Sequence, residues 1–285
     1  MLTQQIAQPE TASRAHTHAN GAGTMYVIGD IHGEYAKLMV LLRKAGLIDS
    51  TMQWAGGEAT LCFLGDYVDR GPDGIGVIDL IMCLEREAAA AGGQVISLLG
   101  NHDAFLLAAY QMGDVLNDRG SYFKFDWLTI GGQTGDLARM TPEHAQWLRE
   151  RPAMVLADDR LLIHADAMMY TDCGNSVDAV NAHFSHILHS DNVTDWNRML
   201  DQFSERYAFY ANGYNGRHKL GVERARSMLR MFGGKQIIHG HTPISVLREV
   251  DPTAVTDSML YAHGLCVNVD AGMYRGSPGV VHLVH

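Results

Sequence analysis

The stretch LCFLGDYVDRGPDG at residues 61–74 joins a short apolar run to a loop that holds three acids and one arginine. An apolar run that ends in Gly-Asp is typical of a buried strand, and GPDG is typical of a turn. Asp73, just before the next helical segment, is expected to cap that helix. For Asp66, Asp69 and Arg70 two interpretations are open: a solvated turn, or a loop that holds metal ions and an anion.

Four other apolar runs end in a polar cluster in the same way. They are MYVIGD (25–30), QVISLLGN (94–101), RLLIHAD (160–166) and KQIIHGHTPI (235–244). Helical segments at 34–48 and 74–93 separate the first three strands of the chain, and this pattern predicts βαβ units with parallel strands. In open α/β sheets ligands bind beyond the carboxyl ends of the strands, so the polar clusters are expected to meet at one place.

These clusters offer aspartate, asparagine and histidine side chains. Mixed carboxylate and imidazole ligands suit Mn, Fe or Zn better than Ca or Mg. An aspartate shared between two ions would place them about 3.5–4 Å apart, which is the spacing of two-metal hydrolytic sites. Each cluster alone is better explained as a solvated turn, and it is their succession along the chain that favours a metal centre.

The composition sets limits on partners and location. The chain has 285 residues, a formal net charge of −10 and no run rich in Lys or Arg. Such a balance argues against binding of a nucleic acid duplex or of an anionic membrane. Four cysteines without a CxxC pair, no secretory signal and no long apolar segment predict a cytoplasmic protein.

The amino-acid sequences of these clusters and their order along the chain resemble those of the metallophosphoesterase superfamily. The matching motifs are GDIHG (29–33), GDYVDRG (65–71), GNHD (100–103), HAD (164–166) and GHT (240–242). More narrowly, they are similar to the phosphoprotein phosphatase family, in its bacterial and Shewanella-like branch. The resemblance implies an α/β fold of the calcineurin-like type, with two central mixed β-sheets flanked by helices and with helical cap insertions.

The chain is therefore divided into a tail and one domain. Residues 1–24 are polar and are expected to form a disordered tail. Residues 25–285 are expected to form a single metallophosphoesterase catalytic domain. Its helical insertions are placed at about 104–150 and 168–232, where they would cover the site.

The resemblance also implies the site, residue by residue. It implies six metal ligands, which are Asp30, His32, Asp66, Asn101, His164 and His241. Asp30 and His32 would bind the first ion, Asp66 would bridge both ions, and the other three would complete the second. His102 would be the general acid, with Asp69 to orient and charge it. Arg70 would hold phosphate oxygens together with Asn101.

The chain departs from the family pattern at two points. Ala165 and Asp166 stand where the family usually has Gly-Gly, and Asp166 would either favour a cationic substrate or bind a ligand histidine. The second phosphate-binding arginine of the family has three candidates in this chain: Arg198, Arg206 and Arg217. Arg217 is preferred because NGYNGR reads as a loop that could approach the ions.

Two further polar residues beside the motifs are given structural roles. His239 is expected to be packed beside the metal ligands rather than to bind an ion. Asp103 is expected to cap the helix that it begins rather than to support His102.

The resemblance implies a phosphomonoester hydrolase that depends on two divalent ions, with Mn preferred and Fe or Zn as alternatives. A metal-bound hydroxide would attack phosphorus in line with the leaving oxygen, without a covalent intermediate. The expected substrate is a phosphoprotein or phosphopeptide, on Ser/Thr or Tyr. The alternatives are a hydrolase of dinucleoside polyphosphates that resembles diadenosine tetraphosphatase, and a non-catalytic binding protein on the same scaffold.

Overall fold

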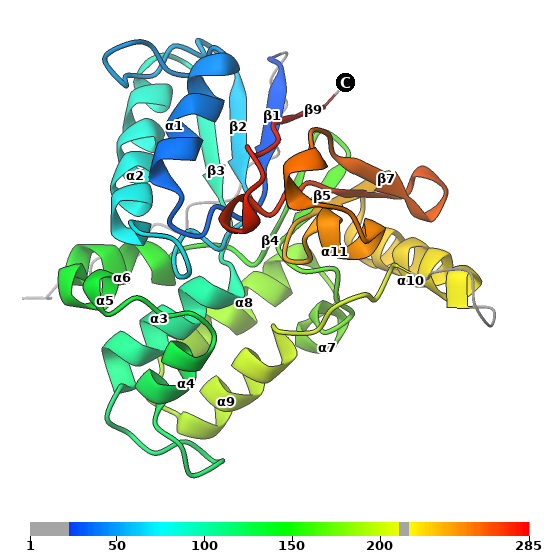
Figure 1. The fold of residues 1–285 in the computed structure, drawn as a ribbon. Helices are drawn as coiled ribbons and strands as arrows, with labels where there is room; N and C mark the ends of the chain where they lie inside the picture. The colour runs from blue at the N-terminus through cyan, green and yellow to red at the C-terminus, as the bar shows by residue number, and fades with distance from the viewer. Residues whose placement is uncertain (1–22, 211–216, 285) are drawn as a thin grey trace, which may run out of the picture.

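Two β-sheets lie at the centre of the molecule, with helices on their outer faces and at one end (Figure 1). The computed structural model describes residues 23–210 and 217–284, and the side chains of 217–219 are outside this description. The predicted tail at 1–24 lies outside the described residues except for its last two. The two mixed sheets and flanking helices confirm the predicted fold class.

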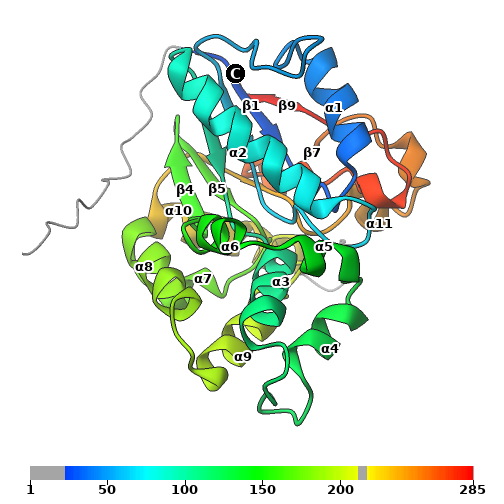
Figure 2. The same ribbon diagram turned by 90° about the vertical axis from the view of Figure 1, so that its left-hand side faces the viewer.

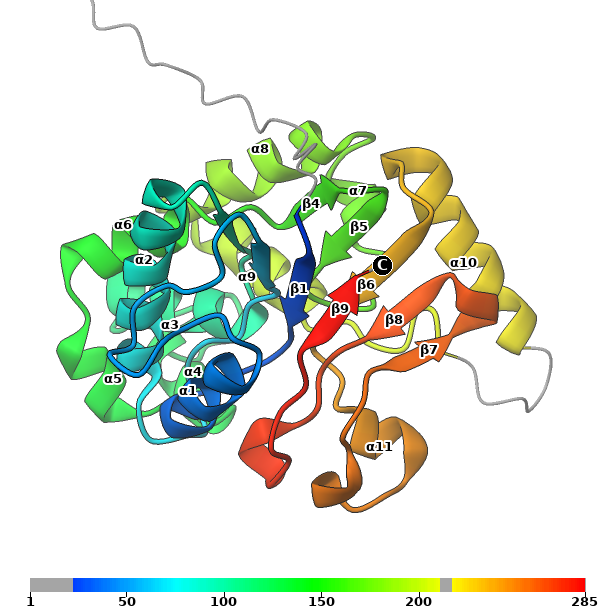
Figure 3. The same ribbon diagram turned by 90° about the horizontal axis from the view of Figure 1, so that it is seen from above.

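The first sheet has the strand order β3-β2-β1-β9. Its strands are β1 (Met25–Ile28), β2 (Thr60–Phe63), β3 (Gln94–Ser97) and β9 (His282–Val284). The first three are parallel, as the βαβ pattern predicts, and β9 is antiparallel to β1. The crossover helices α1 (Tyr35–Lys44) and α2 (Gly74–Ala90) cover the outer face of this sheet (Figure 3). Asp73 accepts a hydrogen bond from the backbone N–H of Gly76, which confirms it as the cap of α2.

The second sheet has the order β4-β5-β6-β8-β7. Its strands are β4 (Met154–Ala157), β5 (Arg160–Ile163), β6 (Gln236–His239), β7 (Met259–Tyr261) and β8 (Cys266–Asn268). The two antiparallel edge strands of this sheet, β4 and β7, were not predicted from the sequence. The pair β4–β5 is a hairpin whose two loop residues, Asp158 and Asp159, both have positive φ. Positive φ at both loop residues matches the twist of a two-residue hairpin. The stretch MVLA-DD-RLLI is therefore the sequence feature that could have predicted this hairpin.

Seven helices form one group at the carboxyl ends of the parallel strands (Figures 1 and 2). They are α3 (Asn101–Met112), α4 (Phe123–Thr129), α5 (Thr134–Arg139), α6 (Pro142–Arg149), α7 (Tyr170–Cys173), α8 (Val177–Leu188) and α9 (Val193–Gln202). We call this group the helical cap. The helix α10 (Arg217–Phe232) belongs to the second predicted insertion, but it lies beside the second sheet, as does α11 (Ile244–Arg248). None of the helices in the described part of the chain combines the length and apolar character that crossing a bilayer requires.

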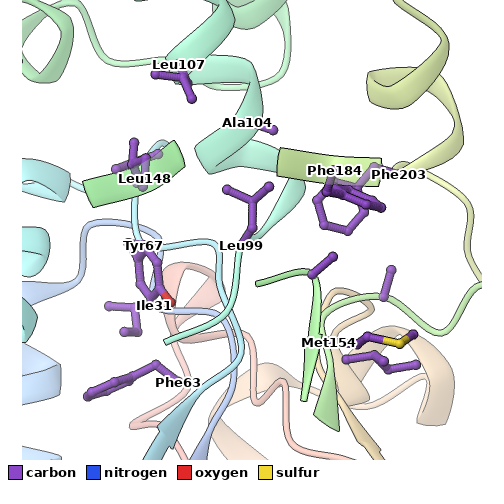
Figure 4. Close-up of a cluster of buried hydrophobic side chains, with 14 of the residues drawn as sticks. Ile31, Phe63, Tyr67, Leu99, Ala104, Leu107, Leu148, Met154, Phe184 and Phe203 are labelled. Carbon is purple, nitrogen blue, oxygen red and sulfur yellow. The ribbon is translucent and has the colours of Figure 1, made fainter. Parts of the chain in front are cut away.

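The apolar core runs without a break from the first sheet into the helical cap (Figure 4). Phe63 and Tyr67 lie at its sheet end, Leu107 lies within α3, and Phe184 and Phe203 lie at its far side. A second apolar cluster, with Val27 and Leu162 among its members, fills the space between the two sheets. The polar side chains at the strand ends lie between these two apolar clusters and are themselves buried.

The loops after β2 and β3 are joined by hydrogen bonds in both directions. The Asp103 carboxylate accepts from the backbone N–H groups of Gly100, Asp66 and Tyr67, at 2.9, 2.8 and 2.9 Å. In return, the Asp66 carboxylate accepts from the backbone N–H of His102 at 2.9 Å. Asp103 therefore caps α3, as predicted, and it also holds the loop of β2 against the start of α3. We call these four contacts the Asp66–Asp103 junction.

We expect Asp103→Ala to lower the free energy of unfolding by about 3 kcal/mol or more, because it leaves three buried N–H groups without an acceptor. The measurement is urea unfolding followed by circular dichroism. Asp103→Asn is the matched control, since it keeps one acceptor oxygen and should lose less. A loss below about 1 kcal/mol for Asp103→Ala would contradict the importance of the junction.

Candidate metal centre

The predicted metal ligands all lie at the carboxyl ends of strands of the two sheets, and all are buried. Each follows its strand within a few residues: Asp30 and His32 after β1, Asp66 after β2, Asn101 after β3, His164 after β5 and His241 after β6. The structure brings them together in one place. Two groups have ligand atoms within 4.8 Å of one another: His32–Asp66–His102 and Asp66–His164–His241. Asp66 is the member that they share.

The second group has the closer contacts. The Nε2 atom of His164 lies 3.1 Å from Asn101 Oδ1, 3.1 Å from His241 Nδ1 and 3.4 Å from Asp66 Oδ1. His164 Nδ1 lies 2.9 Å from the carbonyl oxygen of Leu64. That carbonyl can only accept, so Nδ1 carries the hydrogen and Nε2 presents its lone pair to the other three atoms.

Asn101 Oδ1 and the ionised Asp66 carboxylate can only accept, so their approach to the Nε2 lone pair is unfavourable without a cation between them. Burial lowers the pKa of His164, so its ring is neutral at neutral pH and Nε2 has no proton to share. An ion with a double positive charge would turn this repulsion into coordination. These four side chains therefore fit a divalent metal ion.

The first group is built in the same manner. His32 Nδ1 lies 2.9 Å from the carbonyl oxygen of Val68, so its Nε2 lone pair also faces the cluster. That Nε2 lies 3.6 Å from Asp66 Oδ2 and 3.8 Å from Asp30 Oδ2. Asp30 Oδ2 is buried and has no hydrogen-bond partner among the described residues, while Asp30 Oδ1 accepts from the backbone N–H of His241. An unpaired buried carboxylate oxygen beside a ligand histidine fits a second ion.

The raised pKa values of Asp30 and Asp66 are also consistent with a site that binds cations. Burial, and after it the charge of the neighbouring Asp66, raise the pKa of Asp30 to about 6. Burial likewise raises the pKa of Asp66 to about 6. Because a carboxylate must lose its proton to bind a metal ion, positive charge at the site would reverse these shifts.

Backbone strain is concentrated at this site. Five of its residues have positive φ without being glycine: His32, Asp66, Asp69, Arg70 and His241. Such residues persist only where surrounding contacts hold them, and they gather at functional sites. Here the backbone N–H of His32 donates to Asp66 O at 2.8 Å, and that of Gly71 donates to His32 O at 3.0 Å. The two long motifs therefore hold each other in their strained conformations.

His102, a member of the first group, also forms a hydrogen-bonded pair with Asp69. His102 Nδ1 and Asp69 Oδ2 are 2.7 Å apart, and both side chains are buried. His102 Nε2 points the other way, to a guanidinium nitrogen of Arg70 at 2.9 Å. The second terminal nitrogen of Arg70 lies 2.9 Å from His32 Nε2, and the ring of Tyr274 stacks on the guanidinium at 4.3 Å. Arg70 therefore reaches into the cluster, as predicted. The stacking of Tyr274 on its guanidinium was not predicted from the sequence.

The three arginine candidates lie in different places. Arg217 is the first residue of α10, and its side chain lies outside the described residues, so its role stays a prediction. Arg198 is exposed on α9. Arg206 is half-buried and donates to the carbonyl oxygen of His241 at 3.4 Å, and its charge lowers the pKa values of His32, His164 and His241. Of the candidates with described side chains, Arg206 is the one that the structure brings to the ligands.

Asp166 and His239 have structural partners. Asp166 Oδ1 accepts from the Thr242 hydroxyl at 3.1 Å, and Oδ2 accepts from the backbone N–H of Tyr207 at 3.0 Å. It therefore ties the end of the helical cap to the GHT loop, which differs from both roles that its position suggested. His239 Nε2 lies 2.6 Å from the Tyr261 hydroxyl, so it is packed beside the ligands as predicted.

The candidate metal centre and a comparison with known proteins together identify the family of this chain. A family model described as calcineurin-like phosphoesterase matches residues 23–245, which include every predicted metal ligand. The chain belongs to this family. Proteins of the family use divalent metal ions, in agreement with the two ligand groups.

Three relatives illustrate the similarity. The chain is 38% identical over 79 residues to Shewanella-like protein phosphatase 2 of Arabidopsis thaliana, an alignment that covers 28% of this chain and 20% of that protein. It is 28% identical over 202 residues to the symmetrical bis(5'-nucleosyl)-tetraphosphatase of Enterobacter sp. (strain 638), covering 66% of this chain and 63% of that protein. Its fold matches a cold-active protein tyrosine phosphatase of a psychrophilic Shewanella species with a TM-score of 0.68 at 23% identity, covering 93% of this chain and 76% of that chain.

These similarities support the predicted position in the phosphoprotein phosphatase family, in its Shewanella-like branch. The alignments nevertheless span less than two thirds of the length of either sequence relative. The structural match confirms the calcineurin-like fold.

We expect Asp66→Asn to lower the metal content from two ions per chain to one or none. The amide keeps the oxygen that accepts from the His102 N–H but loses the charge that both ligand groups share. Metal content is measured by plasma mass spectrometry after reconstitution with Mn²⁺. Asp73→Asn, in the same loop but outside both groups, is the control and should retain both ions. Full occupancy in Asp66→Asn would show that Asp66 is not the bridging ligand.

Proposed function

We propose that this phosphoester hydrolase is a phosphomonoesterase with a dinuclear metal centre, and that its substrates are phosphoproteins. The observation that carries the proposal is the sharing of Asp66 by two groups of buried ligand side chains. A carboxylate common to two groups is the arrangement that a bridged pair of ions requires.

The ions would be held by the side chains already described. The first would lie between Asp30, His32 and Asp66, and the second between Asp66, Asn101, His164 and His241. When bound, two divalent ions supply charge neutralisation for the phosphate and an activated water as nucleophile. Mn²⁺ is the proposed ion, with Fe or Zn as alternatives, because the donors mix carboxylate and imidazole.

Arg70 is proposed to bind the phosphate oxygens. Its two terminal nitrogens already face atoms of the cluster, so the guanidinium fork points into the space where a phosphate would lie. A guanidinium binds two phosphate oxygens at once, and stacking on Tyr274 restrains its plane. Arg206, from the other side of the cluster, is proposed as the second arginine in place of Arg217.

His102 is proposed to protonate the leaving oxygen from Nε2. Its Nδ1 hydrogen is bound by Asp69, which fixes the tautomer and leaves Nε2 facing the phosphate position. Burial lowers the pKa of His102, and the nearby His32 and Arg70 lower it further. An ionised Asp69 carboxylate, 2.7 Å from Nδ1, would favour the protonated histidine that the role of general acid requires.

Similarity to Shewanella-like protein phosphatases favours a protein substrate. A second candidate is a hydrolase of dinucleoside polyphosphates, and the 202-residue similarity to the tetraphosphatase favours it. A non-catalytic scaffold is disfavoured because every predicted ligand and the His102–Asp69 pair are present and brought together.

A panel of substrates tests the proposal. The Mn²⁺-reconstituted protein should release phosphate from phospho-Ser, phospho-Thr or phospho-Tyr peptides with a kcat/KM at least about 100-fold above that for diadenosine tetraphosphate; such a difference corresponds to about 2.7 kcal/mol of transition-state binding. The reverse preference would replace the proposal with the second candidate. Absence of turnover on every substrate, with both metals bound, would favour the non-catalytic scaffold.

We expect His102→Asn to slow hydrolysis of phenyl phosphate by about 10²–10⁴-fold, the usual contribution of a general acid. Hydrolysis of p-nitrophenyl phosphate should fall much less, because its leaving group departs without a proton. His186→Asn, an exposed histidine on α8, is the control. Equal losses on the two substrates would remove His102 from the role of general acid.

A further inference from the structure

The side chain of Trp127, in α4 of the helical cap, reaches the catalytic pair. Its indole Nε1–H donates to Asp69 Oδ1 at 2.8 Å, while Asp69 Oδ2 binds His102 Nδ1 at 2.7 Å. Trp127 and Asp69 are both fully buried. The three side chains therefore form a single row of hydrogen bonds that ends at the proposed general acid.

We propose that Trp127 is a positioning residue of the reaction: it fixes the Asp69 carboxylate, which in turn fixes His102. The inference rests on the proposed function, since it assigns a role within the same site. It extends that site to α4 of the helical cap, a helix that carries none of the five motifs.

The need for a second donor follows from the burial of Asp69. A buried carboxylate oxygen without a partner is destabilising, because it has lost its hydrogen bonds with water and gained none in the protein. In the described structure the two side-chain hydrogen bonds to this carboxylate come from His102 and Trp127. Without the indole, Oδ1 would have to turn toward another donor, and Oδ2 would leave His102 Nδ1.

An indole is suited to this position by its chemistry. Its N–H is a donor that neither accepts a proton nor loses one near neutral pH. It therefore lowers the proton affinity of Asp69 without competing with His102 for the carboxylate. Burial raises the pKa of Asp69, and the bond from Trp127 opposes that rise. The bond from Trp127 thus favours the charged form of the carboxylate beside the histidine.

The segment after Trp127 also supports the turn that carries Asp69 and Arg70. The carbonyl oxygen of Gly131 accepts from the backbone N–H of Arg70 at 2.9 Å. Gly131 has φ +114°, and a Cβ atom there would lie 2.9 Å from Arg70 Cγ. Asp69 and Arg70 both have positive φ, so this strained pair needs contacts that hold it. Residues 127–131 donate one hydrogen bond to Asp69, from the Trp127 indole, and accept one from Arg70, at the Gly131 carbonyl.

Two other buried tryptophans donate their indole N–H groups to acceptors outside the active site. Trp147, also in the helical cap, donates to Glu85 Oε2 at 2.9 Å, and Trp196 donates to the carbonyl oxygen of Ser190 at 2.8 Å. Trp127 alone among these three donates to a residue of the catalytic pair. Trp147 therefore offers a matched control.

The test is a comparison of Trp127→Phe with Trp147→Phe, both reconstituted with Mn²⁺. Phenylalanine keeps an aromatic ring in the core and removes the N–H. We expect Trp127→Phe to lower kcat/KM for phenyl phosphate by about 10-fold or more, a part of the contribution of general acid catalysis. For p-nitrophenyl phosphate the loss should stay within about twofold, because this leaving group needs little protonation. Trp147→Phe should change both substrates by the same factor.

A second measurement does not depend on activity. In ¹H–¹⁵N spectra of the protein, the indole signal that is missing from Trp127→Phe is assigned to Trp127. Asp69→Asn should shift that signal and leave the other indole signals in place. This readout also serves if Trp127→Phe fails to fold, in which case the signal is assigned by selective labelling.

The outcomes separate the inference from the proposed function. Equal losses on both phosphate esters in Trp127→Phe, or an indole signal that Asp69→Asn leaves unmoved, would overturn the positioning role. A wild-type protein with both metals bound but without turnover of either ester would overturn the proposed function, while the spectra would still report whether Trp127 binds Asp69.

Discussion

The Asp66–Asp103 junction is the interaction on which the site depends. Asp103 accepts three backbone N–H groups from the loops after β2 and β3, and Asp66 accepts the N–H of His102 in return. Asp66 belongs to both ligand groups, and His102 is the proposed acid. The position of His102 relative to the ligand Asp66 is therefore set by hydrogen bonds between buried carboxylates and backbone N–H groups. Since the junction is buried, water cannot replace any of its partners.

The helical cap contributes to the site as well as covering it. Trp127 binds Asp69, Gly131 binds the backbone of Arg70, and Asp136 accepts from the N–H groups of Gly74 and Ile75 at the start of α2. On the other side, the ring of Phe203 packs edge-on against the ligand His164. The cap reaches the loop of β2 at three points, so it restrains the strained turn that carries Asp69 and Arg70.

The strands, ligands and helix cap that could be predicted are those that depend on a short stretch of sequence. An apolar run that ends in Gly-Asp predicts both a strand and a polar side chain at its end, which placed Asp30 and Asp66. The cap at Asp73 is equally local, since it depends on a turn and the next three residues. The edge strands β4 and β7 were missed although they are as long as the strands that were predicted, and the signal for β4 lay in its hairpin loop, Asp158 and Asp159. Asp166 was misjudged because its partners, Thr242 and Tyr207, are distant in the chain.

The sequence by itself determined the parallel βαβ core, the ligand types and their order, because each motif joins a strand to a polar loop within a few residues. It also indicated the family, since five such motifs in succession leave few alternatives. Only the tertiary structure decided which acids of LCFLGDYVDRGPDG face the ligands, that Arg206 rather than Arg198 lies beside them, and that Trp127 supports Asp69. These assignments depend on the packing of the cap against the strand ends, and packing brings together residues whose separation along the chain carries no local pattern.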